Sequence, residues 1–222
     1  DINFNARPHR VRQKVYRQLL GKAVVGIGYG LIARVGKIDG KRLPILTQIV
    51  RGSREDENEV SLKEETLKQA SRQLAADEVL VHDGGAKLSD MHNATVKRYV
   101  IRLASNCTGR RNELPPYKGR GPYPSKGVLV RPLERTFKGK VHAATPEDEK
   151  MSFEFEGRTI GVRVWRHLVR ADLAVSSANE TFSIWEIDDP LFEGVLLLGT
   201  NLPDDVAPDT IYQLYIDRWP VE

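Results

Sequence analysis

The chain has 222 residues, of which 40% are hydrophobic and 29% are charged, proportions typical of a folded globular protein. No segment approaches the roughly 20 consecutive apolar residues that a membrane-spanning helix requires, so we expect no membrane partner. A single cysteine, Cys107, excludes an internal disulfide and a multi-cysteine zinc site within the chain, and it favours a reducing cytosol.

The net charge of +4 is unevenly distributed along the chain. Residues 107–140 hold nine Lys or Arg and two acids, and residues 1–22 hold six and one. Residues 180–222 hold ten acids and a single arginine, Arg218. Basic segments of this kind bind polyanions, and a separate acidic cluster either binds cations or is solvated. The charge pattern alone leaves nucleic-acid binding and ordinary solvated loops equally open.

The first half of the chain predicts alternating strands and helices. The predicted elements are strands over 22–35 and 43–50, a helix over 61–76, a strand over 78–83, a helix over about 87–97 and a strand over 98–105. Asp39-Gly40 predicts the hairpin turn between the first two strands. Ser61 predicts the N-cap of the first helix, with Glu64 completing a capping box. The strand that ends at Asp83 is short and apolar.

The second half predicts mostly short strands and begins with a loop. Residues 108–127 are rich in Pro, Gly and basic side chains and lack periodicity, which predicts a long loop. Glu156-Gly157 predicts a tight turn between two strands, and a last helix begins at about Pro208. We therefore predict an α/β core over 1–106, a β-rich basic insertion over 107–190, and a return to the core over 191–222.

The closing helix carries the most informative pattern. At 100° per residue, Tyr215, Arg218 and Glu222 fall on one stripe. An ordinary salt-bridged surface would give the same stripe. Trp219 lies beside this stripe, and its large ring favours a helix that packs against the protein over one that is surrounded by solvent. Pro220 removes a backbone donor at a cost of about 3 kcal/mol or a kink, which suggests that the direction of Glu222 is fixed.

These residues resemble a known signature. Tyr215-x-x-Arg218-x-x-x-Glu222 and the wording RWPVE resemble the Y-(2)-R-(3)-E signature of the DDE transposases of bacterial insertion sequences. The segment VHDGG around Asp83 resembles the second-aspartate motif of that family. The resemblance covers essentially the whole chain. It implies an RNase H-like fold, a mixed five-stranded sheet flanked by helices, with a β-rich insertion before the last helix, and the order of the predicted elements agrees with it.

The resemblance also implies a catalytic site. It makes Asp1, Asp83 and Glu222 the three catalytic acids, which would hold two Mg²⁺ or Mn²⁺ ions, because a pair of divalent cations neutralises the attacking and leaving oxygens in phosphodiester cleavage. Arg218 would either orient Glu222 or hold a phosphate. Tyr215 would lie against the DNA backbone or pack into the protein.

Further residues are candidates for DNA contacts. The basic candidates are Lys118, Arg120, Lys126, Arg131, Arg135, Lys138 and Lys140. The interleaved aromatic residues Tyr117, Tyr123 and Phe137 could stack on a displaced base. In similar transposases a tryptophan of the insertion holds a flipped base. Trp165 and Trp185 are candidates for that role, and both fit the core of the protein equally well.

The resulting expectation is a transposase catalytic domain that cuts transposon ends and joins them to target DNA, as a homodimer on DNA at the nucleoid of a bacterial cytoplasm. The alternatives are a non-catalytic DNA-binding relative, decayed or inhibitory, and another RNase H-like nuclease. We expect the chain to be a piece of a longer polypeptide. The resemblance does not imply that the piece is active alone, because the signature's lysine would fall beyond Glu222.

Overall fold

The structure is a computed structural model that describes residues 13–17, 22–26, 28–39, 41–51 and 59–218. The chain divides into two compact units. The first unit comprises residues 1–76, 90–96 and 217–222, and the second comprises residues 77–89 and 97–216. No helix of the described part is long and apolar enough to cross a membrane.

The first unit contains two antiparallel hairpins and a helix. Strands β1 (Gln13–Arg17) and β2 (Lys22–Gly26) form one hairpin, and β3 (Tyr29–Ile38) and β4 (Lys41–Arg51) form the other. Asp39 has a φ of 49° between β3 and β4, which confirms the predicted turn. Helix α1 (Glu59–Gln73) contacts β3 and β4. It approaches β3 so closely that a Cβ at Gly30 would meet the Thr66 side chain.

Both predicted helices of this region form, with different ends. Helix α1 begins at Glu59, so the prediction of Ser61 as its N-cap is wrong, because Ser61 lies inside the first turn. Helix α2 (Leu88–Asn93) is shorter than predicted. It ends because Thr95 adopts a φ of 52°, which turns the backbone out of the helix.

The second unit is built on one mixed sheet. Its hydrogen-bonded order is β5 (Leu80–His82), β6 (Tyr99–Arg102), β14 (Leu196–Thr200), β13 (Phe182–Asp188), β12 (Arg158–Arg170), β7 (Gly109–Arg111) and β8 (Leu129–Val130). Strand β11 (Glu149–Phe155) pairs with residues 158–164 of β12, and β7 pairs with residues 168–170 of the same strand. Strands β5 and β6 are parallel, and the other pairs are antiparallel. Strands β9 (Arg135–Phe137) and β10 (Lys140–His142) form a separate hairpin.

The mixed α/β character is confirmed, whereas the predicted five-stranded arrangement is not. The sheet of the second unit has eight strands among the described residues. Residues 107–190, predicted as an insertion, supply β7, β8, β11, β12 and β13 to the same sheet that holds β6 and β14. Strand β13 is buried over Phe182–Ile187, so it needs a strand on each side and cover on each face. This burial explains why the segment continues the sheet.

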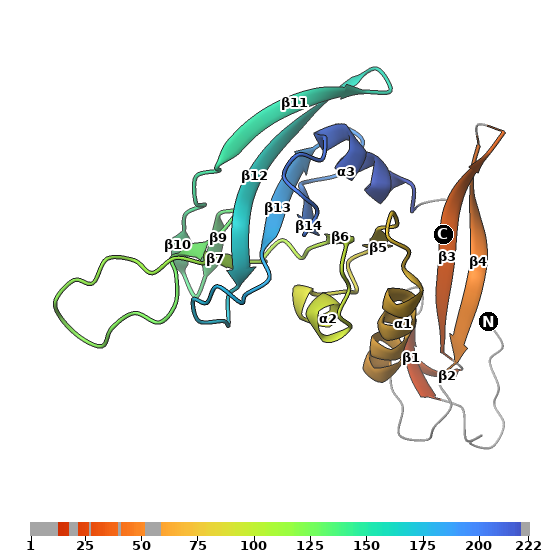
Figure 1. Cartoon of the computed structure of the whole chain (residues 1–222), viewed down its shortest axis with the longest axis horizontal. Coiled ribbons are helices and arrows are strands. Elements are labelled where there is room, and N and C mark those ends of the chain that lie inside the picture. Colours follow the sequence, from red (N-terminus) through yellow and green to blue (C-terminus); the bar gives the residue numbers. More distant parts are fainter. Residues whose placement is uncertain (1–12, 18–21, 27, 40, 52–58, 219–222) are drawn as a thin grey trace. The chain divides into compact units, whose positions relative to one another are not determined.

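Helix α3 (Pro208–Ile216) covers part of this sheet and starts at the predicted proline (Figure 1). It contacts β5, β6 and β11. Ile211, Tyr212 and Tyr215 are each 1% exposed, and they join a core of Val100, Ile160, Val162, Val164, Trp185, Ile187, Leu196 and Leu198. The helix therefore owes its place to a buried apolar face with two tyrosines in it.

The turn between β11 and β12 also confirms a prediction. Glu156 and Gly157 have φ values of 48° and 76°, and Phe155 pairs with Arg158. Two successive residues with positive φ form the hairpin turn whose twist matches that of the strands, and glycine at the second position adopts it without strain.

Candidate functional site

Asp83 lies directly after β5, at the carboxyl end of a parallel strand pair. The register of β5 and β6 places His82 beside Ile101, so Asp83 and Arg102 follow as neighbours at the same edge. The Asp83 carbonyl accepts a hydrogen bond from the Ala86 amide (3.2 Å), which closes a turn over Gly84 and Gly85. Ligands of α/β sheets gather outside the carboxyl ends of parallel strands. The backbone thus presents the Asp83 side chain at the edge where such sites form.

Tyr215 reaches Asp83 from the closing helix. Its hydroxyl donates a hydrogen bond to Oδ1 of Asp83 over 3.2 Å, although the two residues are 132 positions apart. The ring of Tyr215 is buried, and Asp83 keeps 40% of its side chain exposed. Of the two roles predicted for Tyr215, packing describes this arrangement. Helix α3 and the end of strand β5 therefore meet at the Asp83 carboxylate.

Arg102 completes this corner and was not predicted from the sequence. Its Nη1 lies 3.6 Å from Oδ1 of Asp83, and its side chain is 51% exposed. The signal that could have found it is the parallel pairing of β5 and β6, because the last residues of two such strands lie side by side. Asp83, Arg102 and Tyr215 form what we call the strand-end corner, an acid with one cation and one hydroxyl donor.

Two of the three predicted catalytic acids, Asp1 and Glu222, lie outside the described residues. Within the described part, no three His, Cys, Asp or Glu side chains are grouped to hold a metal ion. Asp83 fits one ligand position of a Mg²⁺ site, because it is a partly exposed carboxylate at a strand end and Mg²⁺ takes hard oxygen ligands while keeping waters.

Helix α3 ends at Ile216 and Arg218 lies in the turn that follows, so the prediction that Arg218 shares a helical stripe with Tyr215 is wrong. The residues that follow α3 belong to the first unit. Asp217 pairs with Arg42 of β4 through Oδ1 and Nε, which are 2.7 Å apart. Arg218 is half-buried. Its two predicted roles, orienting Glu222 or holding a phosphate, both stay predictions.

A buried acid also fixes α3, through a residue in the middle of the helix. Asp189 follows β13, and its side chain has no exposed surface. It accepts hydrogen bonds from the hydroxyl of Tyr212 and from the Leu191 amide (2.9 Å), and Nε of Arg158 lies 3.5 Å from it. Burial raises the pKa of Tyr212, and the neighbouring Asp189 carboxylate raises it further. Tyr212 therefore stays a neutral donor, and its bond to Asp189 ties the middle of the helix to the end of β13.

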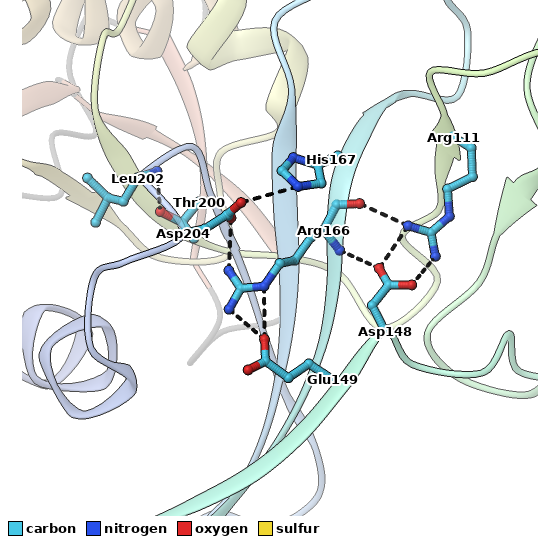
Figure 2. A network of polar contacts seen from close by, with 8 residues as sticks. All are labelled: Arg111, Asp148, Glu149, Arg166, His167, Thr200, Leu202 and Asp204. Carbon is cyan, nitrogen blue, oxygen red and sulfur yellow. Dashed lines mark hydrogen bonds and ion pairs between the residues drawn. The ribbon is translucent and has the colours of Figure 1, made fainter.

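A second network of charges holds the sheet to the loop that precedes α3 (Figure 2). The Arg166 guanidinium bonds Oε2 of Glu149 (2.7 and 2.9 Å) and Oδ1 of Asp204 (2.9 Å). His167, at a bulge in β12 with a φ of 53°, places Nε2 3.2 Å from Oδ2 of Asp204. Asp148 receives both Nη atoms of Arg111 (2.5 and 2.8 Å) and the Arg166 amide (2.8 Å). Each of these carboxylates is bonded to an arginine. Through Asp204 the network fixes the loop that precedes α3 to strand β12.

The Asp148 contacts predict a pH dependence of stability. Burial raises the pKa of Asp148, but hydrogen bonds from Arg111 and the Arg166 amide outweigh it, so its pKa lies below the ordinary value. A carboxylate with a lowered folded pKa adds stability above its unfolded pKa of about 3.9, and that stability is lost as pH falls through the folded value. We expect the free energy of unfolding, measured by urea titration, to fall below about pH 4. In Asp148→Asn this fall should be shallower, and the curves should run parallel between about pH 6 and 8. Equal slopes below pH 4 would contradict the assignment.

Both tryptophans proposed for base stacking are core residues. Trp165 is 0% and Trp185 is 2% exposed. The Trp165 indole N–H donates to the carbonyls of Thr145 and Pro146, both at 3.0 Å. The Arg166 guanidinium lies 5.5 Å from the centre of the Trp185 ring. Neither ring has a face open to a base in this structure.

The predicted basic residues fall into two groups. Exposed side chains belong to Lys118, Arg120, Lys126, Lys138 and Lys140. Arg131 and Arg135 are half-buried, and their Nη1 atoms donate to the carbonyls of Ala143 (3.4 Å) and Asn106 (3.3 Å). The first group is therefore the one available to a phosphate backbone.

No protein-family model matches the chain, and no curated protein shows significant similarity to it.

Proposed function

We propose that this chain carries the catalytic core of a DDE transposase, which cuts DNA at transposon ends and transfers the freed 3′ ends to target DNA. The observation that carries the proposal is the hydrogen bond from the Tyr215 hydroxyl to Asp83. Asp83, from the segment VHDGG, and Tyr215, the first residue of the Y-(2)-R-(3)-E pattern, are far apart in sequence and contact each other in the fold. A helix that served only as a salt-bridged surface would not require Tyr215 to be buried with its hydroxyl bonded to Asp83.

The residues of the strand-end corner suit phosphodiester chemistry. Asp83, with Asp1 and Glu222, would bind Mg²⁺ or Mn²⁺, which when bound neutralises charge on the attacking and leaving oxygens. Tyr215 holds the Asp83 carboxylate in one orientation through Oδ1. Arg102 is half-exposed beside it, and its guanidinium is suited to hold a phosphate oxygen of the DNA strand.

The test is a strand-cleavage assay of the full-length polypeptide on DNA, with Mg²⁺ or Mn²⁺ and with EDTA. The proposal expects cleavage that requires the metal and is lost in Glu222→Ala, while DNA binding measured by gel shift persists. As a matched control, Glu193→Ala removes an exposed glutamate of the second unit and should leave cleavage unchanged.

Two outcomes would overturn the assignment. Binding without any cleavage by the wild type would favour a non-catalytic DNA-binding relative. Normal cleavage by Glu222→Ala would place the chemistry elsewhere, as in another nuclease. Under the proposal the protein acts as a homodimer on DNA in the bacterial cytoplasm.

A further inference from the structure

The loop between β7 and β8 projects from the sheet of the second unit (Figure 1). It carries an aromatic pair. The rings of Tyr117 and Tyr123 stack with their centres 4.1 Å apart and their planes 20° apart. Tyr123 is 78% exposed although one face of its ring lies against Tyr117, so the other face is open to solvent. Large aromatic rings normally lose such exposure to the core or to a partner.

The loop holds this pair in place through its own backbone. The Tyr117 hydroxyl donates to the Gly121 carbonyl over 2.9 Å. Gly119 and Gly121 have φ values of 74° and 82°, a conformation that glycine adopts without strain. Together they turn the chain back so that Tyr123 returns over Tyr117. The open ring face is thus presented by a shaped turn.

The base of the loop is fixed to the sheet. The Arg110 guanidinium bonds the carbonyls of Gly127 (2.7 Å) and Ala171 (2.9 Å). The Asn112 side chain donates to the Ser176 carbonyl (2.8 Å) and accepts from its amide (3.1 Å). A Cβ at Gly127 would fall 1.8 Å from the Arg111 carbonyl oxygen, so the two ends of the loop touch. A ligand on the aromatic pair would therefore be held relative to the sheet.

Charge decides which ligand suits the pair. Lys118, Arg120 and Lys126 are exposed and flank the two tyrosines in sequence, and Glu113 is the one acid between residues 113 and 127. Lys126 also interacts electrostatically with Asp172. Lys118 and Arg120 form no ion pair with any described residue, so both remain available to an anion. A flat open ring face beside cations matches a nucleotide, whose base stacks and whose phosphate binds the cations. In duplex DNA the base faces are already stacked, so the match requires unpaired bases.

We propose that the Tyr117–Tyr123 pair with Lys118, Arg120 and Lys126 is a docking surface for single-stranded DNA, with an unpaired base on the open face of Tyr123. This deepens the proposed transposase function, in which strands separate at a cut end. DNA binding by this surface does not depend on the catalytic acids, because none of its residues touches the strand-end corner.

The experiment is fluorescence anisotropy of a labelled 15-nucleotide oligo-dT and of a duplex of the same length, in EDTA, with the 222-residue chain. Tyr123→Leu should weaken oligo-dT binding about tenfold, the scale of losing one base–aromatic stack, and should change duplex binding less than about twofold. Tyr123→Trp should keep binding. Tyr29→Leu, the same change at another exposed tyrosine, is the matched control and should bind like the wild type.

Each contrary result has a distinct meaning. Equal losses for the two DNA forms in Tyr123→Leu would overturn base stacking. Absence of wild-type binding to oligo-dT would also overturn the proposal and favour a protein partner for this loop. Circular dichroism of each variant would exclude unfolding. These binding measurements are made in EDTA and involve no cleavage, so a failure of the proposed catalysis and a failure of this surface give different results.

Discussion

Asp83→Asn is expected to lower the rate of strand cleavage by about a thousandfold or more, the scale on which losing a group that stabilises transition-state charge acts. Asparagine keeps the shape of the side chain and an oxygen that accepts the Tyr215 hydroxyl, so the fold should persist. It loses the charge that a divalent cation requires. Single-turnover cleavage of a transposon-end substrate measures the effect, and thermal unfolding checks that the variant is folded.

The control for this substitution is Asp205→Asn, which changes an exposed aspartate of the same unit in the same way. It should cleave within about twofold of the wild type. DNA binding by Asp83→Asn should equal or exceed that of the wild type, because one negative charge near the phosphates is removed. Cleavage by Asp83→Asn within tenfold of the wild type would remove Asp83 from the catalytic site.

Asp189→Ala should destabilise the second unit by about 3 kcal/mol, the usual scale for removing one partner of a buried charged group. The substitution leaves the Tyr212 hydroxyl and the Leu191 amide without their acceptor, and it removes the carboxylate that lies 3.5 Å from Nε of Arg158. The measurement is the free energy of unfolding from urea titration. Since Tyr212 lies one helical turn before Tyr215, we also expect a lower cleavage rate in the folded protein.

The neighbouring residue provides a matched control. Asp188 is exposed at the end of β13, so Asp188→Ala should change stability by less than about 0.5 kcal/mol. Similar losses in the two variants would show that the Asp189 contacts do not stabilise the fold.

The elements that were predicted well are those with a local signal. The turns at Asp39 and Glu156-Gly157 and the helix start at Pro208 each follow from the residues at that position. The strand end at Asp83 was also predicted, because an apolar run stops at a glycine-rich turn. In these places the local backbone preference agrees with the fold, so a few neighbouring residues are enough to predict the element.

The features that were missed depend on distant partners. In the sequence Arg102 is an ordinary strand residue, and only the pairing of β5 with β6 places it beside Asp83. Asp189 and Tyr212 are 23 positions apart, and no periodicity links them. The stacking of Tyr117 on Tyr123 depends on backbone turns at Gly119 and Gly121 that the composition of the loop does not specify. Residues 107–190 were predicted as an insertion from their change in composition, and the sequence does not show that five of their strands pair into the sheet that holds β6 and β14.

The position of β12 and β13 limits how this protein can be divided or recombined. Both strands lie between others in the ladder of the second unit, so removing them would leave β14 with a bare edge and separate β6 from β7. Residues 107–190 therefore cannot be exchanged as an independent cassette. The projecting β7–β8 loop can tolerate such exchange, because its two ends already touch at Gly127 and a longer or shorter excursion leaves the ladder intact.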